Sequence, residues 1–129
     1  MDKTNNLFEL FNSCIVNTAS RNLVGNIEQG NVNLLSSSHY KSIIESLSLA
    51  LINIGIKKKT KFGIYLPNSI QWHLIDMSIM VTGAICVPFY RDLSIHEFCQ
   101  QLTYTDCEGV FVENLDIFVF CDEYKGAAD

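Results

Sequence analysis

Three short, almost uninterrupted apolar runs, separated by helical patterns, constrain the fold of this chain more than any other feature. The runs read KFGIYLP at 61–67, AICVP at 84–88 and EGVFV at 108–112. Between the first two, the chain up to Thr82 is apolar nearly all round, as in a heavily buried helix. Between the second and the third, Ser94-x-x-Glu97 forms a capping box, which typically opens a helix. Buried strands that alternate with helices predict a parallel sheet covered on both faces.

Two further helices and a hairpin are predicted in the amino-terminal half. Residues 6–20 carry apolar side chains at helical spacing, and a second such segment runs from Ser38 to a stop at Gly55. The stretch between these helices is rich in Asn, Gly and Ser and predicts a loose hairpin around 26–30. The buried stripe of the second helix is expected to hold Ile43, Leu47, Ala50 and Ile54, with Ile44 and Leu51 alongside.

The predicted fold class is therefore α/β. We expect a partial layered half-domain with a mostly parallel sheet flanked by helices, preceded by an N-terminal helix and a loose hairpin. The 129 residues, of which 48% are hydrophobic, fit one compact domain.

The net charge of the chain argues against a nucleic-acid partner. The formal net charge is -5, whereas binding to nucleic acid phosphates depends on clustered lysine and arginine. The exception is the cluster of Lys57, Lys58, Lys59 and Lys61, directly before an apolar run. We interpret this cluster as a solvated loop leading into a strand rather than as a membrane or phosphate patch.

No leader or membrane-spanning segment is expected. The N-terminus MDKTNNLFEL has neither a basic region nor an apolar core of the secretory type. The longest apolar stretch, 77–90, is interrupted by Thr82, Gly83 and Pro88, and it is shorter than the roughly 20 residues that span a bilayer. The sequence predicts a cytoplasmic protein and leaves peripheral membrane contact open.

No complete set of catalytic or metal-binding residues is found. Gly25 and Gly30 have the glycine spacing of a phosphate-binding P-loop, but lysine and a hydroxyl residue do not follow, so a turn is predicted. His96 and Cys99 could share a helix face, yet no second ligand pair with metal-site spacing accompanies them. His73 lies on the most apolar helix and is expected to be a core residue rather than a base. We therefore name no catalytic, cofactor-binding or metal-binding residue.

Several short motifs nevertheless follow one another in a specific order. They are Asn68-Ser69-x-x-Trp72 after the first apolar run, Gly83-Ala84-x-x-Val87-Pro88-x-Tyr90 around the second, and Val112-Glu113-Asn114 after the third. In this order they resemble the N-terminal part of the adenylate-forming (AMP-binding, acyl-CoA synthetase) superfamily, closest to its long-chain fatty-acid–CoA ligases. The chain departs from the family at Lys59-Thr60, where a glycine and an acid are usual, and at Gln71, where glutamate is usual.

The resemblance covers about residues 18–114. Residues 1–129 are therefore expected to form a single partial domain with a divergent tail at 115–129. Six residues carry the resemblance, and we refer to them as the motif residues: Asn68, Ser69, Trp72, Gly83, Pro88 and Tyr90. Their expected role is structural, in shaping the sheet edge and the start of the following helix.

The resemblance implies ATP-dependent activation of a fatty acid to an acyl-adenylate, followed by transfer to the thiol of coenzyme A. It implies ATP, Mg²⁺ and coenzyme A as cofactors of the full-length family, with the phosphate-binding loop, the magnesium-binding acid and the catalytic lysine all downstream of the matching region. We therefore expect a truncated N-terminal part that is inactive alone and has no cofactor of its own. The alternative is a non-catalytic binding or assembly module that exposes an apolar surface to a partner or to a second copy. An unrelated small α/β regulator fits these motifs poorly.

Overall fold

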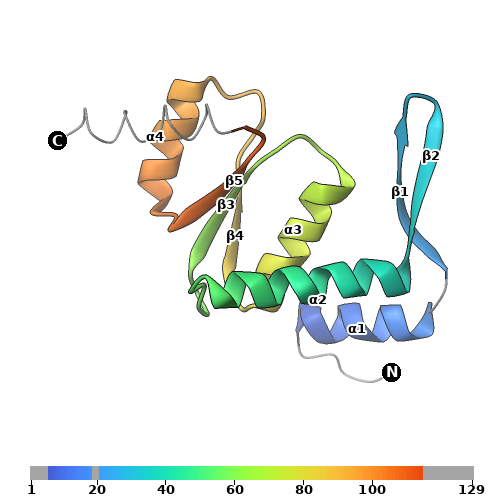
Figure 1. Cartoon of the computed structure of the whole chain (residues 1–129). Coiled ribbons are helices and arrows are strands. Elements are labelled where there is room, and N and C mark those ends of the chain that lie inside the picture. The colour runs from blue at the N-terminus through green and yellow to red at the C-terminus, as the bar shows by residue number, and fades with distance from the viewer. Residues whose placement is uncertain (1–5, 19–20, 115–129) are drawn as a thin grey trace.

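The computed structural model describes residues 6–18 and 21–114 (Figure 1). Its helices are α1 (Leu7–Asn17), α2 (Ser37–Asn53), α3 (Ile70–Val81) and α4 (Ile95–Thr105). Its strands are β1 (Asn22–Glu28), β2 (Asn31–Ser36), β3 (Lys61–Tyr65), β4 (Ile85–Pro88) and β5 (Gly109–Val112). The predicted α/β class is confirmed, while the tail predicted at 115–129 lies outside the described residues.

The three apolar runs form one parallel sheet in the order β4-β3-β5. Lys61 pairs with Ile85 on one side of β3, and Phe62 pairs with Gly109 on the other. Because all three strands run in the same direction, their carboxyl ends meet at one edge of the sheet, and so do the loops that follow them.

Helices cover both faces of this sheet, as the sequence predicts. On one face, Ile64 of β3 packs in a buried cluster with Leu51 of α2 and Ile79 of α3. On the other face, Phe98 and Leu102 of α4 form a separate cluster against the strands. Helices thus pack against both sides of the sheet, which explains why the strand sequences are continuous apolar runs rather than alternating ones.

The α4 face is built around an aromatic stack. The rings of Tyr65 and Phe98 lie 4.0 Å apart at an interplanar angle of 13°, and Phe89 meets Phe98 edge-on at 5.1 Å. The hydroxyl of Tyr65 donates to the carbonyl oxygen of Leu93 at 3.0 Å, so its polar end is satisfied. The predicted capping box of Ser94 and Glu97 is present and fixes the start of α4.

The hairpin of β1 and β2 is a separate two-stranded sheet that projects away from the rest of the molecule (Figure 1). Gln29 and Gly30 connect the strands with φ values of 49° and 82°. Two consecutive positive φ values are typical of the tight hairpin turns whose twist matches that of the strands. The predicted turn is thus confirmed at Gly30, whereas Gly25 lies within β1, and the hairpin turn is tight rather than loose.

The predicted buried stripe of α2 is partly wrong. Ile44 and Leu51 are buried as expected, but Ala50 is exposed and Ile54 is 72% exposed. The buried face instead includes Ser48, whose hydroxyl donates to the carbonyl oxygen of Ser78 on α3 at 3.1 Å. Small serine side chains allow the two helices to approach closely, and their hydroxyls find acceptors on the backbone. A stripe chosen by apolarity alone misses these positions.

Candidate ligand pocket at the carboxyl ends of the strands

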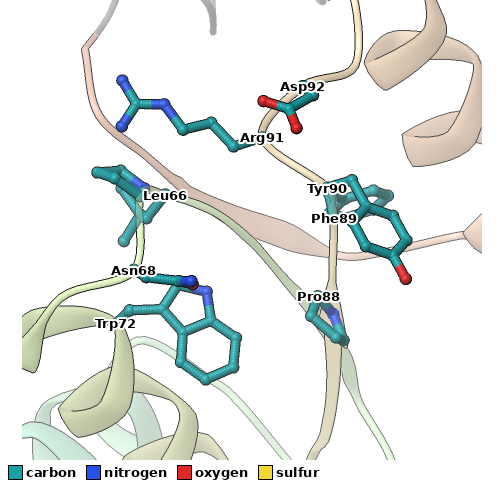
Figure 2. Close-up of a pocket in the computed structure, with 9 residues that line it drawn as sticks. Leu66, Asn68, Trp72, Pro88, Phe89, Tyr90, Arg91 and Asp92 are labelled. Carbon is teal, nitrogen blue, oxygen red and sulfur yellow. The ribbon is translucent and has the colours of Figure 1, made fainter.

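A pocket of about 630 Å³ opens beside the carboxyl ends of β3 and β4. Its lining comes from the loops that follow the two strands and from the first turn of α3: Leu66, Pro67, Asn68, Trp72, Pro88, Phe89, Tyr90, Arg91 and Asp92. Figure 2 shows Trp72 and Pro88 on opposite sides of the opening, with Arg91 and Asp92 at its far end. Open α/β sheets generally bind ligands in a crevice outside the carboxyl ends of their strands.

Local backbone interactions hold the two walls in place. The hydroxyl of Ser69 accepts a hydrogen bond from the backbone N–H of Trp72 at 3.1 Å, so Ser69 caps α3 and fixes its first turn. On the other wall, the backbone N–H of Phe89 donates to the carbonyl oxygen of Ile64 at 2.9 Å, which continues the ladder just beyond Pro88. Pro88 ends β4, consistent with a residue that has no N–H to donate.

The structure divides the motif residues into two groups. Asn68, Trp72, Pro88 and Tyr90 all line the pocket. Ser69 acts indirectly by capping α3, and Gly83 lies at the opposite edge of the sheet, between α3 and β4. The sequence places the first group in two segments about 20 residues apart, and the parallel sheet brings these segments together.

Arg91 and Asp92 line the pocket but were not singled out from the sequence. The Nη2 atom of Arg91 lies 3.3 Å from Oε2 of Glu113, which follows β5. Both side chains of this ion pair are more than half exposed, so the pair contributes roughly 0–1 kcal/mol and its geometry is easily exchanged. Arg91 and Asp92 lie in the loop just after Pro88, the proline that ends β4, and this position is the sequence signal that could have identified them.

The described residues do not fit a bound triphosphate with its magnesium ion. Within 6–18 and 21–114, no three His, Cys, Asp or Glu side chains come together in a metal-binding group. The pocket offers one cation, Arg91, which is already paired with Glu113, and one carboxylate, Asp92. Phosphoryl chemistry depends on several cations and aligned donors around the transferring group. No step of adenylate chemistry is therefore assigned to these residues.

Other reactive side chains in the described region are also poor catalysts. Burial raises the pKa of the Cys86 thiol strongly, and so do the hydrogen bond that the thiol donates to the Asp76 carboxylate and the charge of that carboxylate. The thiol therefore stays protonated and is a weak nucleophile. The expectation that His73 is a core residue is wrong, because its side chain is exposed on α3. Its ring meets the edge of Tyr40, with centroids 6.3 Å apart. Burial and then the charge of Asp76 raise the pKa of Tyr40.

One face of the hairpin is apolar and exposed. Ile27 pairs with Val32, and Gly25 pairs with Leu34, so the side chains of Ile27, Val32 and Leu34 share one face. Ile27 is 75% exposed, and Val32 and Leu34 are exposed as well. We call these three side chains the hairpin face.

No helix in the part of the chain that the structure describes combines the length and apolarity needed to cross a membrane.

Comparison with known sequences points to one family. The sequence model described as "AMP-binding enzyme" matches residues 23–127. Long chain acyl-CoA synthetase 4 of Arabidopsis thaliana is 31% identical over 75 residues, which are 58% of this chain and 11% of that protein. The chloroplastic long-chain-fatty-acid–[acyl-carrier-protein] ligase AEE15 of the same plant is 29% identical over 65 residues, covering 50% of this chain and 9% of the ligase. The chain thus spans about a tenth of the length of these curated relatives.

Solved structures share the fold. The N-terminal subdomain of Klebsiella oxytoca NpsA, in complex with 3-hydroxyanthranilyl-AMSN, superimposes with a TM-score of 0.75 at 14% identity and covers 84% of this chain and 27% of its own. The inhibitor-bound N-terminal domain of FACL13 from Mycobacterium tuberculosis gives a TM-score of 0.71 at 16% identity, with 83% of this chain and 26% of that one covered. Both neighbours are N-terminal portions of their proteins, as the sequence resemblance predicts.

Proposed function

Because the chain belongs to the AMP-binding enzyme family, we propose that it forms the N-terminal part of an enzyme that activates a long-chain fatty acid with ATP and passes the acyl group to coenzyme A. The names of the relatives support this substrate class, since one is a long chain acyl-CoA synthetase and another a long-chain-fatty-acid ligase. The neighbouring NpsA subdomain, in its complex with 3-hydroxyanthranilyl-AMSN, supports the same position in the family.

The observation that carries the proposal is the position of the motif residues. Asn68 and Trp72, after β3 and in the first turn of α3, meet Pro88 and Tyr90, at the end of β4 and just after it, around a single pocket. The pocket combines apolar side chains with the polar groups of Asn68, Arg91 and Asp92, which could orient a small molecule. In this proposal the chain supplies a wall of the substrate-binding region.

We further propose that this chain alone does not catalyse the activation of a fatty acid. The described residues provide neither a cluster of cations for the phosphates nor a metal-binding group, and both are needed to stabilise the charge that develops during adenylation. ATP, Mg²⁺ and coenzyme A would then be bound mainly by the remainder of the enzyme.

A chimera tests the proposal. The matching segment of long chain acyl-CoA synthetase 4 is replaced by the corresponding residues of this chain, and AMP release is measured with ATP, Mg²⁺, a long-chain fatty acid and coenzyme A. We expect AMP release that requires the fatty acid, because the chain restores the missing wall. The same synthetase with the segment deleted is the control and is expected to release none. A chimera that folds cooperatively but releases no more AMP than the deletion would contradict the proposal.

The hairpin face favours a second function, that of an assembly module. Two strands with an exposed apolar face are only marginally stable in water, and a partner or a second copy would cover this face. Replacing Ile27 and Val32 by serine is then expected to abolish self-association in size-exclusion chromatography and binding of a hydrophobic dye. Leu49→Ser, at an exposed position of α2, is the control. A wild-type chain that elutes as a sharp monomer and binds no dye would exclude this function.

A further inference from the structure

We propose that the amino-terminal edge of the sheet is a docking face for a membrane surface that contains anionic lipids. The face consists of the lysine turn (residues 57–60) and the first turn of α1, and it does not depend on the proposed enzymatic function. It lies at the opposite end of the parallel strands from the ligand pocket, at the lower edge of the molecule in Figure 1.

Positive charge is concentrated at this edge. Four of the nine Lys and Arg residues of the chain are Lys57, Lys58, Lys59 and Lys61. The first three are exposed, whereas the ammonium of Lys61 donates to the carbonyl oxygen of Thr105 at 3.0 Å. In a chain with a net charge of -5, this turn is therefore a local exception that would be attracted to an anionic surface. The sequence alone favours a solvated loop here; the ordered backbone of the turn and its apolar neighbours favour a membrane surface instead.

The backbone holds the lysine turn in a fixed conformation. The N–H of Thr60 donates to the carbonyl oxygen of Lys57 at 3.0 Å, and the N–H of Lys57 donates to Oγ1 of Thr60 at 3.1 Å. The N–H of Lys59 donates to the carbonyl oxygen of Gly83 at 2.9 Å, which ties the turn to the loop before β4. The three neighbouring charges are thus displayed on an ordered turn rather than on a loose loop.

Lys59 occupies a conformation that favours glycine. Its φ is 71°, in the left-handed region that disfavours side chains with a Cβ atom. A lysine at this position costs backbone stability, and such a cost is a reason to look for a role of the side chain. Display of a positive charge at the sheet edge is the role that the surroundings support.

Exposed apolar side chains lie beside the lysines. Lys58 lines a groove of about 410 Å³ together with Leu7 and Phe8 at the start of α1. Leu7 is 55% exposed and Phe8 is 42% exposed. Ile85 is also exposed, and its N–H donates to the carbonyl oxygen of Thr60 at 2.8 Å. Apolar side chains flanked by lysines are typical of segments that lie in the interface of an anionic bilayer.

Acidic residues border the docking face and limit its attraction to anionic lipids. Glu9 follows Phe8 on α1, and Asp106 and Glu108 lie near Lys61. The attraction therefore comes from the three lysines of the turn, and it should fall steeply when salt screens them. Nucleic acid is a weaker fit, because it would leave Leu7 and Phe8 uncovered.

Vesicle co-sedimentation of the intact chain tests the proposal. We expect the chain to sediment with vesicles that contain phosphatidylserine, to remain soluble with pure phosphatidylcholine vesicles, and to be released by high salt. Each lysine removed from the turn should weaken partitioning about fivefold. Replacing Leu7 and Phe8 by serine should weaken it as well. Equal binding to both kinds of vesicle, or binding to neither, would overturn the proposal.

Lys59→Gly separates docking from folding. Because glycine fits the positive φ, this variant should have a higher melting temperature than the wild type and yet bind anionic vesicles about fivefold more weakly. Lys41→Gln removes the same charge from α2, where Lys41 is paired with Glu45, and serves as the matched control. Equal losses of binding in the two variants would show that only net charge matters and would refute a docking face at the lysine turn.

Discussion

Phe98→Ala is expected to lower the free energy of unfolding by about 3–5 kcal/mol. Phe98 is completely buried and contacts Tyr65 in a stacked arrangement and Phe89 edge-on. Removing the ring leaves a cavity between α4 and the sheet, which the flanking strands can fill only in part. Urea denaturation followed by the fluorescence of Trp72, the single tryptophan, measures the effect.

Tyr104→Ala provides the matched control on the same helix. Tyr104 is 92% exposed, so its loss should change the free energy of unfolding by no more than about 0.5 kcal/mol. Similar effects of the two substitutions would mean that α4 does not pack on the sheet through Phe98. Since Phe89 also lines the ligand pocket, Phe98→Ala should in addition loosen the β4 wall of that pocket.

Ser48→Leu is expected to lower the free energy of unfolding by about 1–3 kcal/mol, because the larger side chain cannot fit between α2 and α3. Ser48 is buried, and its hydroxyl contacts the backbone of Ser78 on the facing helix. Ser48→Ala removes only this hydrogen bond and should cost about 1 kcal/mol. The difference between the two variants, measured by urea denaturation, separates close packing from hydrogen bonding.

Ser46→Leu is the control for this prediction. Ser46 lies two residues away on the exposed side of α2, so the same substitution there should be almost neutral. If Ser46→Leu and Ser48→Leu were equally destabilising, close packing of α2 against α3 at Ser48 would not be the cause of the loss, because helix propensity alone favours leucine over serine at both positions.

The alternation of strands and helices from β3 to β5 could be predicted because each element has an unambiguous sequence pattern. The strands are continuous apolar runs, and Ser94 with Glu97 specifies the start of α4 by local hydrogen bonds alone. These signals depend on neighbours in the sequence and need no knowledge of the tertiary structure.

The face of α2 could not be predicted in the same way. Ser48 is buried because of what Ser78, 30 residues later, presents to it. An apolarity scale assigns both serines to the surface, since it does not include hydrogen bonds between helices. Apolarity likewise assigns Ala50 and Ile54 to the core, although both are exposed. The buried face of α2 runs through Ile44, Ser48 and Leu51 instead.

The candidate site was predictable only in part. Asn68, Trp72, Pro88 and Tyr90 were identified by resemblance, but their convergence on one pocket follows from the parallel pairing of β3 and β4. Arg91 pairs with Glu113 across 22 residues of sequence, and no local pattern indicates such a contact. The unusual backbone of Lys59 also becomes visible only in the structure, where its turn is tied to Gly83.

The claim that this chain carries scaffold rather than chemistry is tested most directly by the exchange of labelled pyrophosphate into ATP in the presence of a long-chain fatty acid. Adenylate formation releases pyrophosphate reversibly, so the exchange detects the first half-reaction even without coenzyme A. For the isolated chain with ATP and Mg²⁺ we predict exchange equal to that of a blank without protein, because the described residues offer no group of cations or metal ligands for the phosphates. Exchange above the blank that requires both the chain and the fatty acid would contradict this claim.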